Sequence, residues 1–281
     1  MLALTKVKKN IEFNQRFTSI LEVLKSIAVS QFHSLEHKLE GSESFDQALQ
    51  SFFASIDIKK MDHPFLNSGN RPAAIIAITS DQGLLGGLNV RVTNTAIGSM
   101  NPAQDQLIVV GDQGKIFARY GKIPFIAFPG VRDEERYQQA ISLRTYLFGK
   151  MKEGQFGSIQ VVYPRALSLV NQRVESAALL PLARQESEAP SVVDWSNMIF
   201  ESSPAHVLEY LAFLWVGEKL NEIFGMSRLA ELGARFVHLE ESTQRIDETN
   251  KKLKLQYFRL RHEMIDQSMR ELFSARVLYA N

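Results

Sequence analysis

The sequence predicts an α/β protein: long N- and C-terminal helices form an antiparallel coiled coil, with a Rossmann-like α/β domain inserted between them. Three observations carry this prediction. A helical apolar pattern opens the chain, short apolar runs alternate with helical patterns in the middle, and a heptad pattern closes it. We expect a coiled-coil helix over residues 1–55, a central α/β domain over 71–192, and a second coiled-coil helix over 203–281.

The N-terminal segment is predicted to be one long helix. From Leu2 to Phe53 it contains no proline, and its only glycine is Gly41. Its apolar residues recur in steps of three and four, which is typical of a helix with one apolar stripe. They are Leu4, Val7, Ile11, Phe17, Ile20, Leu21, Leu24, Ile27, Ala28, Phe32, Leu35 and Leu39. Forty helical residues would extend about 60 Å, so this helix must pack along another long element.

The middle of the chain alternates strand and helix patterns. Continuous apolar runs at Ala73–Thr79, Gln106–Gly111 and Ser158–Tyr163 predict buried strands. The run 122–129 contains prolines, which favour an edge strand, and 171–181 is a further candidate. Helical patterns cover residues 89–99, 114–120 and 133–152. This alternation predicts a mainly parallel sheet covered by helices on both faces.

The C-terminal segment is predicted to be a second long helix. Ser203 is a suitable N-cap and Pro204 suits the first helical position. From Leu232, alternating steps of four and three define a coiled-coil seam in which Thr243 and Asn250 are polar interruptions of the kind that fix register. The seam positions are Leu232, Phe236, Leu239, Thr243, Ile246, Asn250, Leu253, Tyr257, Leu260, Met264 and Gln267.

Composition excludes several classes of function. The chain has no cysteine, hence no disulfide, thiolate metal site or thiol nucleophile. Its 32 basic and 31 acidic residues offer no general attraction to nucleic acid, and no apolar run is long enough to span a bilayer. His33 and His37 have the spacing of a helical metal site, but a solvated helix face is the favoured interpretation. We find no catalytic group and expect no cofactor and no metal.

The segment Ile78–Asn89, ITSDQGLLGGLN, carries the most distinctive motif. Its glycines could form a phosphate-binding loop after a strand, yet the Walker ending and the full GxGxxG spacing are missing. The favoured interpretation is a tight strand-to-helix turn, with glycines that need positive φ or close packing. The residues assigned to this structural turn are Asp81, Gly83, Gly86 and Gly87.

Motifs over nearly the whole chain resemble those of the γ subunit of F-type ATP synthases. Ile78–Asn89 is similar to the family's I-T-S-D-x-G-L-C-G-G-x-N, and Phe224–Phe236 to its S-x-x-S-E-x-x-A-R-M region. Weaker similarities are Asn171–Leu182, Arg261–Asp266 in the place of R-Q-A-x-I-T, and Phe17–Leu21 in the place of I-T-K-A-M. Three departures are Leu85 for the common cysteine, His262 for glutamine and Asp266 for threonine.

The resemblance implies a non-catalytic rotor subunit that couples ion translocation to ATP synthesis or hydrolysis. Its implied partners are the α, β and ε subunits and the membrane c-ring, with no nucleic acid and no direct membrane span. The implied location is peripheral, on the cytoplasmic face of a bacterial inner membrane. The residues expected at partner interfaces are Thr18, Leu21, Arg235, Arg261, His262, Asp266, Leu272, Phe273 and Arg276.

Two alternatives stay open at this point. Arg235 either forms a plain surface ion pair with Glu231, four residues earlier, or faces a partner chain. Likewise, the seven basic and three acidic residues between Asn250 and Asn281 form either a solvated face or a shaft tip inside partner subunits. The rival function is an α/β small-molecule-binding enzyme with helical oligomerisation arms and a ligand near Asp81 and Gly83.

Overall fold

The structure is a computed structural model that describes residues 2–39, 63, 65–67, 69, 71–182 and 203–279, with side chains as far as Ser274. It contains two compact units, one made of Met1–Ala28 and Phe236–Asn281, the other of Val29–Arg235. Both long helices contribute residues to both units. The part of the expected N-terminal helix beyond Leu39 lies outside the described residues.

A five-stranded sheet forms the centre of the Val29–Arg235 unit, in the order β3-β2-β1-β4-β5. The strands are β1 (Ala73–Ile78), β2 (Gln106–Val110), β3 (Phe125–Phe128), β4 (Ser158–Ala166) and β5 (Gln172–Leu180). All neighbours are parallel except β4 and β5. The mainly parallel sheet is confirmed, and the proline-flanked β3 lies at an edge, where a missing N–H costs least.

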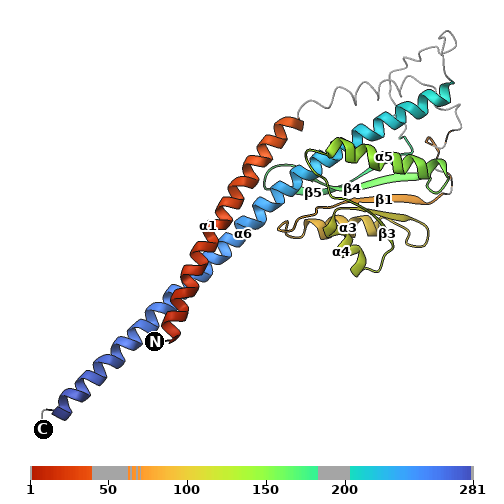
Figure 1. Cartoon of the computed structure of the whole chain (residues 1–281). Coiled ribbons are helices and arrows are strands. Elements are labelled where there is room, and N and C mark those ends of the chain that lie inside the picture. Colours follow the sequence, from red (N-terminus) through yellow and green to blue (C-terminus); the bar gives the residue numbers. More distant parts are fainter. Residues whose placement is uncertain are drawn as a thin grey trace. The chain divides into compact units, whose positions relative to one another are not determined.

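Helices cover both faces of this sheet (Figure 1). Ile75, Leu107 and Val109 point to one face, in a core with residues of α3 (Leu88–Gly98) and α4 (Asp112–Tyr120). Ile76 and Ile108 point to the other face, in a core with α5 (Arg136–Lys152) and α6 (Pro204–Tyr279). Neighbours in a strand point to opposite faces, so continuous apolar runs suit a sheet that is covered twice.

The first part of α6 belongs to the core of this unit. Ser203 Oγ accepts a hydrogen bond from His206 N at 3.4 Å, which agrees with the expected N-cap. Six α6 side chains are then almost completely buried: Leu208, Ala212, Val216, Leu220, Ile223 and Phe224. The sequence predicts a coiled coil for this stretch as well, because an apolar stripe does not reveal whether its neighbour is a helix or a sheet.

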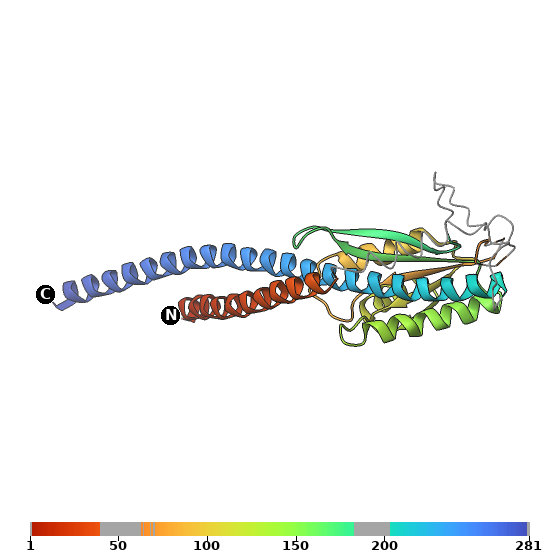
Figure 2. The same cartoon turned by 90° about the horizontal axis from the view of Figure 1, so that it is seen from above.

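The other unit pairs α1 (Leu2–Leu39) with α6, antiparallel and side by side (Figures 1 and 2). Asn14 Nδ2 donates to Asn250 Oδ1 at 3.1 Å, and Lys25 Nζ lies 2.7 Å from Glu240 Oε2. Every predicted seam position from Leu239 to Met264 is at least partly buried, whereas Gln267 is exposed. The heptad prediction and the antiparallel pairing are confirmed.

The prediction of one apolar stripe on α1 is wrong, because the helix carries two. Its buried positions in this unit follow a heptad: Leu4, Val7, Ile11, Asn14, Thr18, Leu21, Lys25 and Ala28. A second heptad runs one residue earlier and is exposed; we call it the outer stripe of α1. It consists of Phe13, Phe17, Ile20, Leu24 and Ile27.

In the described part of the chain, no helix is long and apolar enough to cross a membrane.

Candidate functional site

The loop between β1 and α3 ties the end of β1 to its neighbours through short polar side chains. Thr79 Oγ1 donates to Val110 O at 2.6 Å and accepts from Gly114 N at 3.0 Å. Ser80 and Asn89 clamp each other: Ser80 N donates to Asn89 Oδ1 at 3.1 Å, and Asn89 Nδ2 donates to Ser80 Oγ at 2.9 Å. The polar residues at both ends of the motif therefore fix β2, α3 and α4 around β1.

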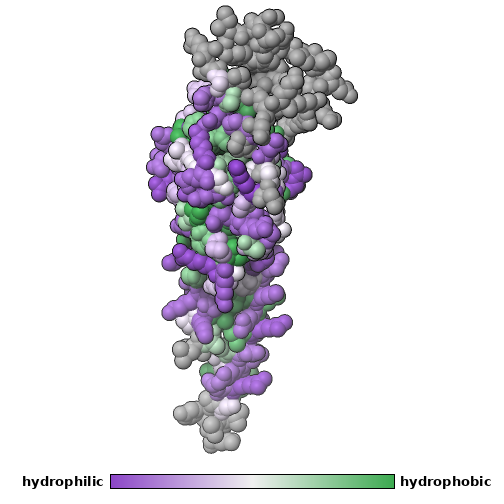
Figure 3. All heavy atoms as spheres, turned by 90° about the vertical axis from the view of Figure 1, so that its right-hand side faces the viewer, coloured by the Kyte–Doolittle hydropathy of each residue, from purple (hydrophilic) through white to green (hydrophobic). Residues whose placement is uncertain are grey.

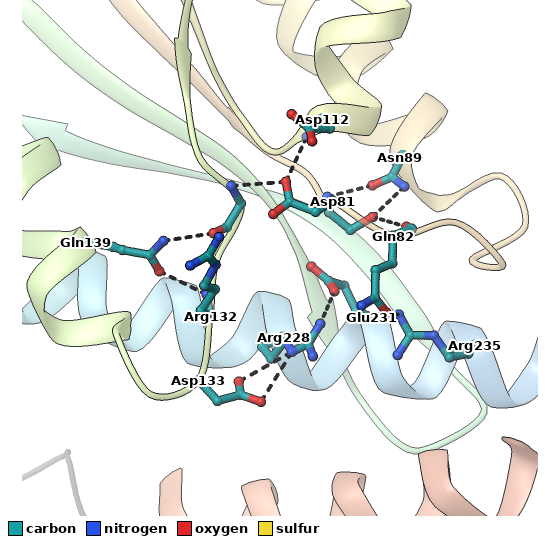
Figure 4. A network of polar contacts seen from close by, with 12 residues as sticks. Asp81, Gln82, Asn89, Asp112, Arg132, Asp133, Gln139, Arg228, Glu231 and Arg235 are labelled. Atoms are coloured by element: carbon teal, nitrogen blue, oxygen red, sulfur yellow. Dashed lines mark hydrogen bonds and ion pairs between the residues drawn. The ribbon is translucent and has the colours of Figure 1, made fainter.

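Asp81 lies where the carboxyl ends of three parallel strands meet (Figure 4). Its Oδ1 accepts hydrogen bonds from Asp112 N at 3.0 Å and from Gly130 N at 3.1 Å. Such N–H groups, at a helix N-terminus and in a loop after a strand, would hold a phosphate in a nucleotide-binding α/β domain. Here the carboxylate of Asp81 accepts the hydrogen bonds of both N–H groups. The ligand position that the rival function requires is thus filled internally.

The glycines of this loop only partly fit the expected turn. Gly86 has φ 56°, as a tight turn requires. Gly87 has φ −89°, and a Cβ at Gly83 or Gly87 would meet nothing within 4 Å. The expectation of positive φ or close packing is wrong for these two, because Leu84, with φ 64°, takes the second left-handed position. Leu84 is also exposed, so its strained backbone presents an apolar side chain at the surface.

The same loop contacts α6. Gln82 Oε1 accepts a hydrogen bond from Arg235 Nη2 at 3.2 Å, and Leu85 and Leu88 pack against Ala234. Of the two alternatives for Arg235, the plain ion pair with Glu231 is not formed in the described structure, and Glu231 pairs with Arg228 instead. Glu231 Oε2 lies 2.7 Å from Arg228 Nη1, because Arg228 is three residues away on the buried side of the helix.

Arg228 in turn joins α6 to the loop after β3, since its Nε lies 3.4 Å from an oxygen of Asp133 (Figure 4). Glu231 is only 3% exposed. Burial raises the pKa of its carboxyl group to about 7, which the nearby Arg228 guanidinium only partly offsets. Burial also lowers the pKa of Arg235, although Glu231 opposes that shift. The junction is therefore a polar contact between α6 and two loops of the sheet, in which Glu231 is buried and the loop residues Gln82 and Asp133 are exposed.

Two arginines of α5 hold α6 further along. The Arg144 guanidinium lies 3.6 Å from the centre of the Phe213 ring, and a Cβ at Gly217 would come within 2.5 Å of its Nη1. Arg136 Nε donates to Asn221 Oδ1 at 3.0 Å. These contacts were not predicted. The feature of the sequence that could have indicated them is a glycine every eight residues on α6, at 217, 225 and 233, each facing a close neighbour.

The expected partner residues near the C-terminus are exposed. Arg261, His262 and Asp266 lie on the surface, and Leu272 and Phe273 are 68% and 62% exposed. His262 Nδ1 lies 2.8 Å from the carbonyl oxygen of Phe258, to which it donates when that nitrogen is protonated. The side chain of Arg276 lies outside the described residues.

Thr18 and Leu21 are placed differently, because both lie in the seam between α1 and α6. Leu21 is 5% exposed, and the Thr18 hydroxyl is buried. Along the same stretch of α1, the surface available to another protein is the outer stripe of α1. Helix α6 carries an exposed heptad of its own, the outer stripe of α6, which includes His262. Its apolar members are Leu255, Phe258, Ile265, Met269 and Leu272.

These stripes leave large apolar side chains uncovered by their own chain. A space-filling view shows hydrophobic surface between hydrophilic side chains along the molecule (Figure 3). From residue 265 to Ser274 every described side chain of α6 is exposed. Contiguous apolar surface of this kind is typical of a protein–protein contact. The geometry thus favours a binding surface on the helices over a catalytic site in the α/β domain.

Comparison with known proteins agrees with this geometry. The model of the family described as ATP synthase matches residues 3–276. The chain belongs to the ATP synthase family. The ATP synthase gamma chain of Desulfitobacterium hafniense is 28% identical over 281 residues, with 97% of each chain covered. That of Clostridium acetobutylicum is 25% identical, over 95% of this chain and 94% of the relative. The resemblance to γ subunits is confirmed.

Solved structures of ATP synthases contain chains with the same fold. The mitochondrial ATP synthase of Euglena gracilis, in a structure of its OSCP, F1 and c-ring, contains a chain that matches with a TM-score of 0.72. The two are 15% identical, with 98% of this chain and 94% of that chain covered. A chain of the rotor of the same enzyme gives a TM-score of 0.68 at 17% identity, covering 94% and 99%.

Within the described residues of this family member, no group of three or more His, Asp or Glu residues could hold a metal ion. A hollow of about 510 Å³ lies between α3 and β5, away from Asp81, and is lined by Arg91, Asn94, Thr95, Gln172, Arg173 and Val174. Arg173 is already paired with Glu175. This hollow therefore gives the rival function no support.

Proposed function

We propose that this chain is the central-stalk rotor subunit of an F-type ATP synthase and is not itself catalytic. The observation that carries the proposal is the 76-residue α6. One part of this helix is built into the core of the α/β domain, and another carries an exposed apolar stripe. A helix fixed firmly at one part and free to contact partners at another can transmit rotation.

The contacts around α6 suit a part that must resist turning within its domain. Apolar side chains interdigitate around Val216 and Leu220, and interiors packed at this density deform little. Directional contacts of Arg144, Arg136 and Arg228 add resistance at three heights along the helix. Torque applied to the α/β domain is therefore passed to α6 rather than lost in slippage.

The paired helices then act on the catalytic subunits. We place the two outer stripes against the surrounding α and β subunits, with Arg261, His262, Asp266 and Leu272 at the β subunits and Phe273 and Arg276 nearby. Because α1 and α6 differ in sequence, rotation presents a different face to each β subunit in turn. Each β subunit then changes between states of different nucleotide affinity, which couples rotation to ATP synthesis or hydrolysis.

The α/β domain completes the assignment. We place it toward the ε subunit and the membrane c-ring, so that ion flow through the ring turns the shaft. The chain would then be a peripheral protein on the cytoplasmic face of the bacterial inner membrane. Proteins from bacteria are among the curated relatives, which supports this placement.

The test is assembly and coupled pumping. We expect the α, β and ε subunits to co-purify with the full-length chain, and the complex to pump ions on addition of ATP in reconstituted vesicles. A chain truncated at Met269 loses the end of α6, including Leu272 and Phe273, and should assemble or pump less well. The α/β domain should unfold at the same temperature in both, because the described core of that domain includes no residue from Met269 onward.

Two results would contradict the proposal. A truncated chain that assembles and pumps like the full-length chain would show that this end of α6 carries no torque. Stoichiometric nucleotide binding by the chain alone, without co-purifying subunits, would favour the small-molecule-binding enzyme instead.

A further inference from the structure

The seam between α1 and α6 is not uniform along its length. The Asn14–Asn250 hydrogen bond and the Lys25–Glu240 ion pair set its register. With this register, four successive layers of the seam each contain a polar side chain. We call them the polar section: Asn14 with Asn250, Thr18 with Ile246, Leu21 with Thr243, and Lys25 with Leu239.

The neighbouring layers are entirely apolar. The same register pairs Ala28 with Phe236 on one side of the polar section. On the other side it pairs Ile11 with Leu253, Val7 with Tyr257, and Leu4 with Leu260. Coiled coils gain most of their stability from apolar seam residues, and polar ones fix register at a cost in stability. The polar section is therefore the weakest part of the pairing, between two stronger parts.

Two hydroxyl groups inside the polar section are left without partners. Thr18 Oγ1 and Thr243 Oγ1 are both buried and make no hydrogen bond within the described structure. A buried hydroxyl without a partner raises the free energy of the closed state, whereas separation of the helices would let water bind it. This contrasts with Asn14 and Asn250, which satisfy each other. The asparagines specify how the helices pair, and the threonines favour their separation.

The outer stripe of α1 does not stabilise the pairing of α1 with α6 in the polar section. Phe13, Phe17, Ile20, Leu24 and Ile27 point away from α6 over the same stretch. Most of the apolar surface of α1 here thus contributes nothing to its contact with α6. The Lys25–Glu240 pair is partly exposed, and exposed ion pairs contribute little.

We infer that the polar section is a built-in point of local opening, where α1 separates from α6 while the apolar layers on both sides stay paired. A helical segment of about a dozen residues is marginal in water without tertiary contacts, so the separated stretch of α1 also loses helical hydrogen bonds. Opening would make the paired helices locally compliant to twisting. The inference concerns the chain alone and stands whether or not the proposed function is right.

Amide hydrogen exchange of the full-length chain, followed by mass spectrometry, tests this inference. We expect the amides of α1 residues 14–25 to exchange faster than those of residues 7–11 and of residues 28–35. The double variant Thr18→Val and Thr243→Val keeps side-chain shape and removes both hydroxyls. It should slow exchange in residues 14–25 by about tenfold or more, because the closed state no longer holds unsatisfied groups.

The matched control is Thr249→Val on the same helix. Thr249 is exposed and its hydroxyl donates to Arg245 O at 2.8 Å, so exchange in residues 14–25 should not change. Two outcomes would overturn the inference. One is protection of residues 14–25 equal to that of the flanking residues, and the other is fast exchange that the double variant fails to slow.

Discussion

Helix α6 is one element in two environments. Between Leu208 and Phe224 it lies inside a core, and side chains on several of its faces are buried. Beyond Phe236 it is buried along a single seam, and from residue 265 it is exposed on all sides as far as Ser274. The difference teaches that apolar residues on this helix have two uses. Those between Leu208 and Phe224 stabilise the fold, and those from residue 265 to Ser274 are available to a partner.

The largest expected effect on stability comes from a comparison of two phenylalanines of α6. Phe224 is 1% exposed and Phe273 is 62% exposed. Phe224→Ala should lower the free energy of unfolding by about 3–5 kcal/mol, because it removes a large buried side chain and leaves a cavity. Phe273→Ala should change it by less than about 0.5 kcal/mol. Urea unfolding of both variants measures the two values; similar losses would show that the stretch from residue 265 to Ser274 also stabilises the fold.

A second test concerns the buried carboxyl group at the junction of α6 with the sheet. Burial raises the pKa of the Glu231 carboxyl group from its ordinary value of 4.5 to about 7. Its contribution to stability is therefore fully present below about pH 4.5 and is lost as the pH rises through 7, by on the order of 3 kcal/mol. Glu231→Gln should make the free energy of unfolding, measured with urea, less dependent on pH between 5 and 8.

The control for this second test is Glu248→Gln, because Glu248 is exposed on the same helix. That variant should keep the pH dependence of the unmodified chain. If Glu231→Gln keeps it as well, the titration belongs to another group.

A third test separates an internal contact from a ligand site. Asp81→Ala leaves the amides of Asp112 and Gly130 without their carboxylate. The free energy of unfolding should fall by about 1–3 kcal/mol, the cost of losing a charge-assisted hydrogen bond. Asp105→Ala provides a comparison, since Asp105 also bonds backbone amides but far from the loop after β3. Unchanged stability of the Asp81→Ala variant would mean that the carboxylate does not hold these loops together.

The smallest expected effect is at His262. It lies in the exposed outer stripe of α6, so His262→Gln should leave the unfolding temperature of the chain unchanged. A clear change in that temperature would show that His262 stabilises the folded chain.

Much of the fold was predictable from periodicity. The apolar runs gave all five strands, and the seam from Leu239 to Met264 agrees with alternating steps of four and three. The two stripes of α1 were not separated, because they are only one residue apart and both contain apolar residues. Which of them faces α6 depends on residues such as Asn14 and Lys25, whose partners are more than 200 positions away.

The candidate site was less predictable. The motif indicated a structural turn, but sequence spacing could not show that Asp81 bonds to amides after two other strands. It also could not show that Glu231 pairs with Arg228 rather than Arg235, since both lie within helical reach. The exposed residues at the end of α6 were identified through family resemblance, because exposure of an apolar side chain has no local signature in the sequence.

The unbroken length of α6 has a consequence for how this chain can change. A helix advances about 100° per residue, so one inserted or deleted residue turns everything beyond it by that angle. Between Leu232 and Met264 such a change would rotate the seam away from α1 and swing the outer stripe to a new side. Substitutions leave this phase intact. We therefore expect differences in length among relatives to fall in loops outside this stretch, where no distant face depends on the residue count.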